Sequence, residues 1–525
     1  MSTGSLTQLA ALGSQDQYLS VAGEITFFKG VYRRHTNFAK ESVFMQFNQT
    51  PAWGSQSTCV ISRTGDLLSK TWLNVKLPAL NPLLGEQEFV DRRRLQGYTG
   101  DAVDLSKKEA QTAFLSQNEG KYPKARYCDC VGFACIEKVD LVIGGTLIDS
   151  HPGHYLQVWD ELTQTPEKKS IAHLVGRSGN AQELEELAQA EQDLYIPLQF
   201  FFCRHLMCSL PLIALQYHQV EIKITFANLK DVVSFAGFSY DGFTGVSGNE
   251  PLGTDSSFYY PDHIKVREMP KERDYQILSA QLMCNLVYLE EEERKTFAGS
   301  THEYLVDLLQ YQGPHPTTGQ NTTYHAYFNH PTSELIWVFV PKVCLDEGEP
   351  FNYTALQSSY NAAGDTLIDA KLQFNGYDRF TSMPASYFRE IVPAQYHTSV
   401  PTRPIYVYSF ALEPEDFRPS GSVNLSRIDN VKLITHHVSF EPPVANGGFY
   451  EVAGTQIGHP ANSGINSGIT NAVAVHPYTD GKGLFLTKTD GVPSDLKQGA
   501  ELRVYARSKN VLRIKSGMAG LAYAN

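Results

Sequence analysis

The sequence predicts an all-β protein built from two large domains. Aromatic residues make up 11% of the chain, 40 glycines and 27 prolines are spread throughout it, and only a few stretches have a helical pattern. Aromatic residues favour strands, while Gly and Pro favour the turns that connect them. The 525 residues exceed one ordinary domain. Because all-β domains extend to about 250 residues, two of them fit this length best.

Strands are expected throughout the first half. After an N-terminal arm over residues 1–24, the first clear strand is Ile25 to Tyr32. Leu73 to Leu77 and Val220 to Phe226 alternate apolar and polar residues. Successive side chains of a strand point to opposite faces, so this alternation predicts strands with one buried face.

Two helices are expected in the connections between these strands. His154 to Thr163 places Tyr155, Trp159 and Leu162 on one face. In the stretch 181–191, Leu184, Leu187 and Ala188 share a face, and Asn180 with Glu183 resembles a capping box at its start.

The second half has the same strand-rich character. We expect strands at 276–289, at the wholly apolar run 335–340, and at a segment that places Tyr406, Tyr408 and Phe410 on one face. Residues 231–262 and 441–500 are rich in Gly and polar residues and lack alternation. The predicted organisation is therefore an arm (1–24), a first domain (25–230), a linker and loop (231–270) and a second domain (271–525) with a long loop at 441–500.

Charge and composition disfavour several classes of function. The chain has 44 Lys and Arg against 56 Asp and Glu, a net charge of −12, and no long basic arm. Wrapping of nucleic acid is therefore not expected to be its task, because that requires many cations against phosphate. The longest apolar runs fall far short of the roughly 20 residues that span a bilayer. No secretion signal is visible at the N-terminus, so folding in a cytosol is expected.

Candidate metal ligands are incomplete. His151 and His154 lack a third ligand at a defined spacing, and the Pro-Gly between them is typical of a turn. Cys128, Cys130 and Cys135 are better explained as buried thiols of a strand region. We expect no metal and no other cofactor.

Catalytic motifs are also missing from the sequence. Some β-sandwich enzymes hold a metal with a closely spaced His-x-His, but His325 and His330 are five positions apart. The chain has no nucleophile elbow, phosphate-binding loop or His-Glu-x-x-His motif. The acidic run that starts at Glu290 is more typical of a solvated helix face than of a cation site. We therefore predict that the protein is not an enzyme.

Six sequence motifs carry a resemblance to a known family. In chain order they are 25–41 (ITFFKGVYRRHTNFAKE), 61–67 (ISRTGDL), 210–218 (LPLIALQYH), 328–337 (FNHPTSELIW), 420–430 (SGSVNLSRIDN) and 504–523 (VYARSKNVLRIKSGMAGLAY). Together they resemble the major capsid proteins of nucleocytoplasmic large DNA viruses, a group that includes iridoviruses, algal viruses and giant amoebal viruses. The motifs extend over nearly the whole chain.

The resemblance implies a fold and a function. It implies two tandem eight-stranded jelly-roll β-sandwiches, with short helices and long loops in the connections. It also implies a homotrimer whose six jelly rolls form a capsomer of near-hexagonal outline, and capsomers that tile an icosahedral shell. The expected location is the capsid of the virion, assembled in the host cytoplasm.

The resemblance also suggests partners. Minor capsid proteins are expected at the inner face and an internal membrane beneath the shell, without direct contact to nucleic acid. The N-terminal arm, with Leu6, Leu9, Leu12 and Tyr18, is the expected assembly segment at that face. Loops at 81–126, 231–262 and 441–500 are candidates for the exterior, where host-surface glycans are a further class of partner.

A glycan-binding protein is the alternative from a different functional class. Jelly rolls also serve as lectins, and the aromatic run Phe258 to Tyr260 offers rings that stack on sugars. An enzyme ranks third, since no constellation of titratable residues supports it.

Overall fold

The fold consists of two successive β-sandwiches and the helices between and beside them. The computed structural model describes residues 11, 28–30, 34–80, 124–165, 167–178, 183–184, 187–188, 190–236, 275–317, 319–346, 349–354, 364–438, 471–475, 484–488 and 499–523. Within this part of the chain, no helix is long and apolar enough to cross a membrane.

The first sandwich pairs two antiparallel sheets. One sheet has the order β1-β11-β3-β7, with the short strand β8 attached to β3, and the other has the order β2-β9-β5-β6. The strands are β1 (Phe38–Gln46), β2 (Gln56–Val60), β3 (Leu67–Leu77), β5 (Ile136–Ile143), β6 (Thr146–Pro152), β7 (Gln192–Pro197), β8 (Leu210–Pro211), β9 (Val220–Phe226) and β11 (Ser279–Leu289).

The second sandwich repeats this arrangement. Its sheets have the orders β12-β24-β15-β19 and β14-β21-β16-β17, with β13 and β25 attached to β24, β20 to β15 and β18 to β16. The strands are β12 (His302–Tyr311), β13 (His315–Thr317), β14 (Asn321–Ala326), β15 (Pro331–Pro341), β16 (Leu367–Phe374), β17 (Tyr377–Asp378), β18 (Met383–Pro384), β19 (Tyr406–Ser409), β20 (Val423–Asn424), β21 (Val431–His437), β24 (Ala500–Lys515) and β25 (Met518–Leu521).

The two sandwiches have the same topology, strand for strand. In chain order, the first, eighth, third and sixth principal strands form one sheet of each sandwich, and the second, seventh, fourth and fifth form the other. This interleaved order is that of a jelly roll, in which the chain alternates between two packed sheets and leaves few strand edges open. The all-β prediction of tandem jelly rolls is therefore confirmed.

The predicted domain boundary is wrong for one strand. We assigned residues from 271 onward to the second domain, but β11 lies between β1 and β3 of the first jelly roll, with Phe44 opposite Met283 and Met283 opposite Trp72. The apolar pattern of residues 276–289 predicts a strand, but it gives no information about which strands pair with it. The other predicted boundaries stay predictions.

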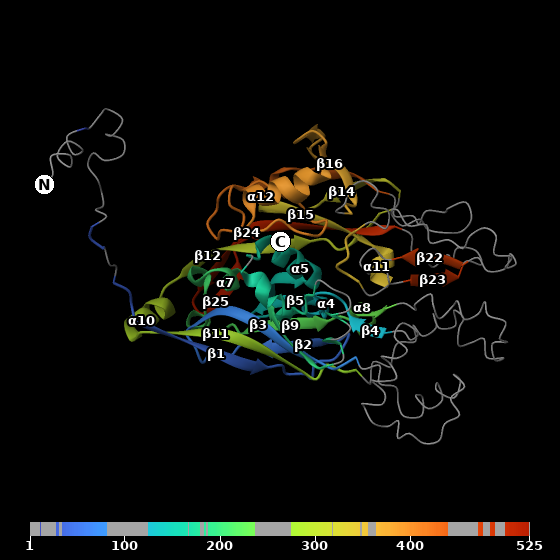
Figure 1. The fold of residues 1–525 in the computed structure, drawn as a ribbon. Coiled ribbons are helices and arrows are strands. Elements are labelled where there is room, and N and C mark those ends of the chain that lie inside the picture. Colours follow the sequence, from blue (N-terminus) through green and yellow to red (C-terminus); the bar gives the residue numbers. More distant parts are fainter. Residues whose placement is uncertain are drawn as a thin grey trace, which may run out of the picture.

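Helices separate the two jelly rolls. Figure 1 shows the layers in succession: the β1-β11-β3-β7 sheet, the β2-β9-β5-β6 sheet, the helices α5 and α7, the β12-β24-β15-β19 sheet and the β14-β21-β16-β17 sheet, while α12 packs beside β19. The helices are α4 (Val131–Ala134), α5 (Gly153–Thr163), η2 (Lys168–Val175), α7 (Phe201–Arg204), η3 (Leu206–Cys208), η4 (Leu212–Ala214), α8 (Leu229–Val232), α10 (Glu291–Gly299), α11 (Lys342–Asp346), η8 (Tyr387–Ile391), α12 (Val392–Tyr396) and η9 (Leu425–Arg427).

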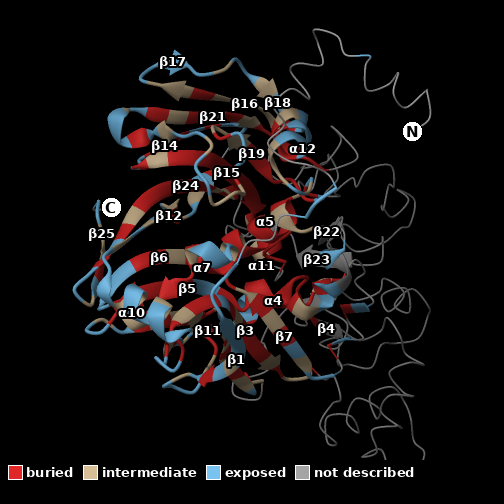
Figure 2. Cartoon of the chain, turned by 90° about the vertical axis from the view of Figure 1, so that its left-hand side faces the viewer, coloured by how far each residue is buried: buried red, intermediate tan, exposed pale blue. Residues whose placement is uncertain are grey.

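The burial of the strands follows their sequence patterns. β9 alternates strictly between buried and half-buried residues, as its sequence predicts. β15 is buried on both faces from Thr332 to Pro341, which confirms the prediction for the apolar run 335–340. One face of β15 contributes Trp337 and Phe339 to the core of the second jelly roll, whereas Ile336 and Val338 belong to a larger core shared with the first. Figure 2 shows this continuous buried interior.

Several segments differ from the prediction. The strand expected at 25–32 lies mostly outside the described residues. Of its described positions, residue 28 is a turn and residue 29 a bend, and the first described strand is β1. Parts of the expected loops are regular: β4 (Lys124–Tyr127) pairs with β10 (Val233–Ala236), and β22 (Asn471–Val475) pairs with β23 (Leu484–Lys488). The rest of these loops lies outside the described residues.

Candidate functional site: a buried ionic junction between the two jelly rolls

The junction between the jelly rolls is built around the helix α5. This helix occupies the connection between β6 and β7, as the sequence pattern of 154–163 predicts. It begins at Gly153, where a Cβ atom would lie 2.1 Å from the carbonyl oxygen of Ile136 and 2.3 Å from that of Phe133. Only glycine permits this close approach, which presses α5 against the first jelly roll.

Aromatic side chains of α5 pack on the sheet of the second jelly roll. The ring of Tyr155 lies 5.6 Å from that of Tyr505 on β24, and the hydroxyl of Tyr353 donates to Gln157 at 2.9 Å. The guanidinium of Arg507, also on β24, lies 4.1 Å above the ring of Trp159. Burial of large rings together with a cation–π contact makes α5 one of the bridges between the two halves.

Arg507 is the centre of a buried charge network. Its guanidinium donates to Glu334 on β15 at 2.6 Å, to the carbonyl of Pro414 at 2.8 Å and to Asp307 on β12 at 3.2 Å. Asp307 also binds Lys509 at 2.6 Å and, from the first jelly roll, Arg204 at 3.2 Å. Each charge is paired, which offsets the large cost of removing charges from water.

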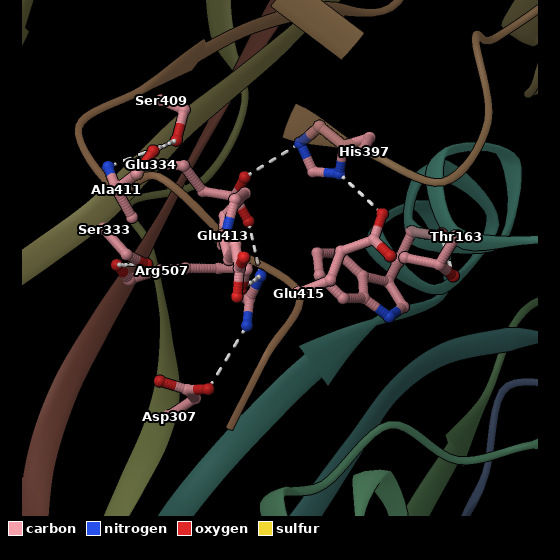
Figure 3. Close-up of polar contacts among 12 residues, drawn as sticks. Thr163, Asp307, Ser333, Glu334, His397, Ser409, Ala411, Glu413, Glu415 and Arg507 are labelled. Carbon is pink, nitrogen blue, oxygen red and sulfur yellow. Dashed lines mark hydrogen bonds and ion pairs between the residues drawn. The ribbon is translucent and has the colours of Figure 1, made fainter. Parts of the chain in front are cut away.

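His397 extends this network toward the surface. Figure 3 shows its ring between two carboxylates: Nε2 lies 3.0 Å from Glu334 and Nδ1 lies 3.0 Å from Glu415. Burial alone would lower the pKa of His397, but the two carboxylates, Glu334 foremost, raise it to about 9. Burial alone would raise the pKa of Glu334, but Arg507 and then His397 lower it to about 2. His397 is therefore a cation at neutral pH, held as a structural ion pair.

A second ionic cluster also contacts the C-terminal half of α5, through Glu161. Arg403 of the second jelly roll contacts Asp129 of the first, donates to the carbonyl of Phe351 at 2.9 Å and lies 3.5 Å from Glu161 on α5. Near it, Arg126 pairs with Glu349 at 2.9 Å across the two halves. These contacts resist both sliding and rotation of one jelly roll against the other.

A third set of contacts brings three of the sequence motifs together. Arg63 of the 61–67 motif donates to the carbonyls of Gln216 and His218 in the 210–218 motif at 2.8 and 3.0 Å. The amide of Tyr217 donates to the carbonyl of Gly517 in the C-terminal motif at 3.0 Å, and the amide of Ala519 donates to His218 at 3.2 Å. Motifs far apart in the sequence thus have a common structural role at the junction.

The junction is unsuited to chemistry on a substrate. The side chains of His397 and Glu334 are fully buried, so the pair resembles an acid–base dyad only in composition. Among the described residues, no group of three or more His, Cys, Asp or Glu side chains could hold a metal ion. An open hollow of about 370 Å³ on the outer sheet of the second jelly roll is lined by Asp369, His436, Lys371 and Asp378, which form two ion pairs with each other.

The candidate metal ligands of the sequence have structural roles. His151 is buried, lies 2.9 Å from Asp149 and stacks on Phe200. His154 is half-buried, with its ring against Phe351, and desolvation lowers its pKa, so it remains neutral. The interpretation of the cysteines as buried thiols is confirmed for seven of the eight, and Cys208 is half-buried. Burial raises the pKa of Cys130 and Cys135 to about 12.

Other predicted residues fall into three groups. Leu6, Leu9, Leu12 and Tyr18 of the arm and the aromatic run 258–260 lie outside the described residues. The acidic run at Glu290 opens the helix α10, which has no buried residue, as predicted for a solvated face. Of the second expected helix, the described positions Glu183, Leu184 and Leu187 are helical, with Leu184 buried and Leu187 exposed.

The fold and the junction define the class of protein. Jelly rolls occur in viral capsid proteins, lectins and some enzymes. Here two of them are joined into one block through buried ion pairs and a shared core, without an accessible reactive cluster in the described part of the chain. This arrangement is suited to a rigid building block.

Comparison with known proteins identifies the family. Residues 293–472 match the family described as large eukaryotic DNA virus major capsid protein, and residues 26–93 and 103–259 match the major capsid protein N-terminus. The major capsid protein of Pyramimonas orientalis virus is 31% identical, and that of Paramecium bursaria Chlorella virus 1 is 30% identical. Each alignment covers 99% of this chain and 100% of the relative.

Solved structures agree with this assignment. The quasi-atomic model of the PBCV-1 virus capsid matches with a TM-score of 0.61 and 27% identity, covering 95% of this chain and 100% of that chain. The Faustovirus major capsid protein shares the fold, with a TM-score of 0.59 at 12% identity over 94% of this chain and 93% of its own. The chain belongs to the major capsid protein family of large eukaryotic DNA viruses. Its relatives are structural proteins of the virion capsid, not enzymes.

Proposed function

We propose that three copies of this chain form a homotrimer, and that the six jelly rolls of the trimer make a capsomer of near-hexagonal outline that tiles an icosahedral shell. The observation that carries the proposal is the strand-for-strand repeat of one jelly roll in the other, joined by a buried junction. Two similar units in each of three chains supply six similar sides around one axis, although the strict symmetry is threefold.

The fixed junction gives this proposal a physical basis. Neighbouring capsomers can meet in a regular lattice only if each block keeps its shape. The pairs Arg204–Asp307 and Arg403–Asp129 cross from one half to the other, so rotation of one jelly roll would leave largely buried charges without partners. Contacts between trimers are expected to be much weaker than contacts within a trimer, since shells assemble through many moderate interactions.

The mass of the purified protein in solution tests the proposal. Light scattering is expected to give three times the 58.5 kDa of one chain. A stable monomer at micromolar concentration would contradict the proposal while leaving the family assignment intact.

The N-terminal arm is proposed as the segment that binds minor capsid proteins at the inner face of the trimer, above an internal membrane. Leu6, Leu9, Leu12 and Tyr18 would supply the apolar contacts. Deletion of residues 1–20 should leave trimers intact but impair shell formation in cells that produce the other capsid proteins. Complete shells from the deletion variant would refute this role.

The proposal places assembly in the host cytoplasm, where the cysteines remain reduced thiols. Loops at 81–126, 231–262 and 441–500 are proposed for the exterior, with host-surface glycans as ligands. Binding of purified trimers to a glycan array tests the latter. An absence of binding would remove glycans from the proposed partners.

A further inference from the structure

The two ends of the strands differ in what is attached to them. The three loops proposed for the exterior all join the body at one end, which we call the loop end: β4 closes the first of these loops, β10 opens the second, and β22 and β23 belong to the third. Figure 1 shows these strands at the right, whereas α10 and β25 lie at the left. We call the left end the arm end, because β1, the strand that follows the N-terminal arm, begins there.

The arm end carries exposed apolar side chains around the turn from β24 to β25. Ile514 of β24 is buried in the core, so Val511 and Lys515 point to the other face of the sheet. On that face, Leu305 of β12 lies opposite Val511, and Met518 of β25 lies opposite Lys515. Leu305 is 44% exposed and Met518 is 50% exposed.

Two exposed tyrosines lie beside the same turn. The amide of Tyr217 donates to the carbonyl of Gly517 at 3.0 Å, and a Cβ atom at Gly517 would lie 2.6 Å from the Tyr217 ring, so the ring lies against the turn. The carbonyl of Tyr523 accepts a hydrogen bond from Asn510 of β24 at 3.0 Å. Tyr217 is 75% exposed and Tyr523 is 62% exposed. Apolar side chains that gather in this way mark an interaction site, and we call Tyr217, Leu305, Met518 and Tyr523 the Tyr217 surface.

An acidic helix lies beside the Tyr217 surface. α10 packs against η4, which ends three residues before Tyr217, and the ring of Phe297 on α10 stacks on His302 at the start of β12. The helix opens with four consecutive glutamates and has no buried residue. Two cations follow the glutamates, but Arg294 is bound to Asp66 at 2.9 Å. A partner of this end is therefore expected to combine apolar side chains with positive charge.

We propose that the Tyr217 surface binds an apolar segment of a minor capsid protein, with lysine or arginine residues of that segment against the glutamates of α10. The inference rests on the proposed capsomer. With the loop end facing outward, the arm end faces the interior, where other copies of this chain lie beside it and not across from it. The N-terminal arm, proposed on separate grounds for the inner face, joins the body at the same end.

The charge of α10 distinguishes a protein partner from the internal membrane. Surfaces that bind a bilayer combine apolar side chains with an excess of lysine and arginine, which anionic lipids attract. Four glutamates beside the Tyr217 surface would repel the same lipids. They attract a cationic segment of a protein, so the electrostatics favour the protein.

A cross-link from position 217 locates the partner. A photoreactive phenylalanine analogue replaces Tyr217 in the full chain, which is produced together with the other capsid proteins of the virus, and cross-linked peptides are identified by mass spectrometry. We expect peptides of one protein other than this chain, with apolar residues flanked by lysine or arginine. The same analogue at Leu278, which is 49% exposed and precedes β11, should not cross-link to that protein. Complete shells without a cross-link from position 217, or with cross-links to a second copy of this chain, would overturn the inference.

Two substitutions test the chemistry of the contact. Met518→Glu places a charge on the Tyr217 surface and should lower the yield of the cross-link from position 217 by roughly tenfold or more. Glu292→Lys reverses an exposed charge on α10 and should lower the yield as well, whereas Leu278→Glu should leave it unchanged. Circular dichroism and light scattering verify that the variants remain folded trimers. An unchanged yield in Met518→Glu would refute the contact, and an unchanged yield in Glu292→Lys would refute its electrostatic part.

Vesicles test the rival partner. Purified trimers are mixed with vesicles of phosphatidylcholine and phosphatidylserine and centrifuged in a density gradient, where the trimers are expected not to float with the lipid. Flotation that Met518→Glu abolishes would assign the Tyr217 surface to the membrane and overturn the inference, while leaving the proposed capsomer intact. A monomer in light scattering would instead refute the proposed function itself.

Discussion

Removal of the Arg507 side chain should weaken the fold more than any exposed charge does. In Arg507→Met, the carboxylates of Glu334 and Asp307 lose a fully buried partner, and Trp159 loses the nearer of the two guanidinium groups over its ring. Breaking a buried ion pair from one side costs about 3–5 kcal/mol, because the remaining charge stays buried. Lys509 and Arg204 still pair with Asp307, and His397 still pairs with Glu334, so the loss is expected near the lower end of this range.

Urea unfolding at fixed protein concentration measures this loss, and the same strand offers a matched control. Arg513, also on β24, pairs with Glu303 at 2.8 Å, but both side chains are about half exposed. An exposed pair contributes roughly 0–1 kcal/mol. Arg513→Met should therefore shift the unfolding midpoint much less than Arg507→Met. Equal losses in the two variants would refute the structural role assigned to the junction.

Three further predictions follow from the same contacts. The pKa of His397 lies above its ordinary value and that of Glu334 below it, so the stability that their pair contributes should be complete between about pH 4.5 and 6.5. This contribution should be lost as the pH rises through about 9, when His397 loses its proton, and as the pH falls toward 2, when Glu334 gains one. In urea unfolding, His397→Gln should abolish the loss at alkaline pH, and an unchanged pH profile would contradict the assignment. Gly153→Ala should lower the melting temperature by several degrees, because the added Cβ would meet two carbonyl oxygens. Gly299→Ala, which adds a Cβ in open space, should leave the melting temperature unchanged. Equal melting temperatures of the two variants would show that α5 can shift to make room. Tyr406→Phe should lower the free energy of unfolding by about 1–3 kcal/mol, since the buried backbone amides of Thr366 and Leu367 lose their hydrogen-bond acceptor. An unchanged free energy of unfolding would show that these amides bind another acceptor.

The sequence predicted those parts of the fold that a local pattern encodes. The alternation of β9 and the continuous apolar run of β15 follow from which faces are covered, so both strands were predictable. The pairing of β11 was not, because its partners β1 and β3 lie more than 200 positions earlier in the chain. A pattern of burial identifies a strand, whereas the choice of partner depends on the topology of the whole jelly roll.

The ionic junction was missed for a related reason. Asp307, Glu334 and Arg507 lie on three strands and are far apart in the sequence, and each alone is an ordinary charged residue. A signal was nevertheless present: Glu334 directly precedes the apolar run 335–340, and Arg507 follows a strand segment of apolar and aromatic residues. A charge within a strand that is covered on both faces requires a buried partner, and this argument would have predicted the pair without naming its members.

The family assignment explains why the site of this protein is a set of contacts and not a pocket. The resemblance carried by the six motifs is confirmed, and three of those motifs meet at the junction through Arg63, Tyr217 and Gly517. Their role in the fold could not be derived from composition, because Arg63 binds backbone carbonyls and the C-terminal motif takes part through backbone groups.

Electron microscopy of the purified particle tests the central claim most directly. Class averages are expected to show a block of near-hexagonal outline with threefold symmetry, and a refined map should place six jelly rolls around its axis. A particle that contains one double jelly roll, or two related by a twofold axis, would contradict the account.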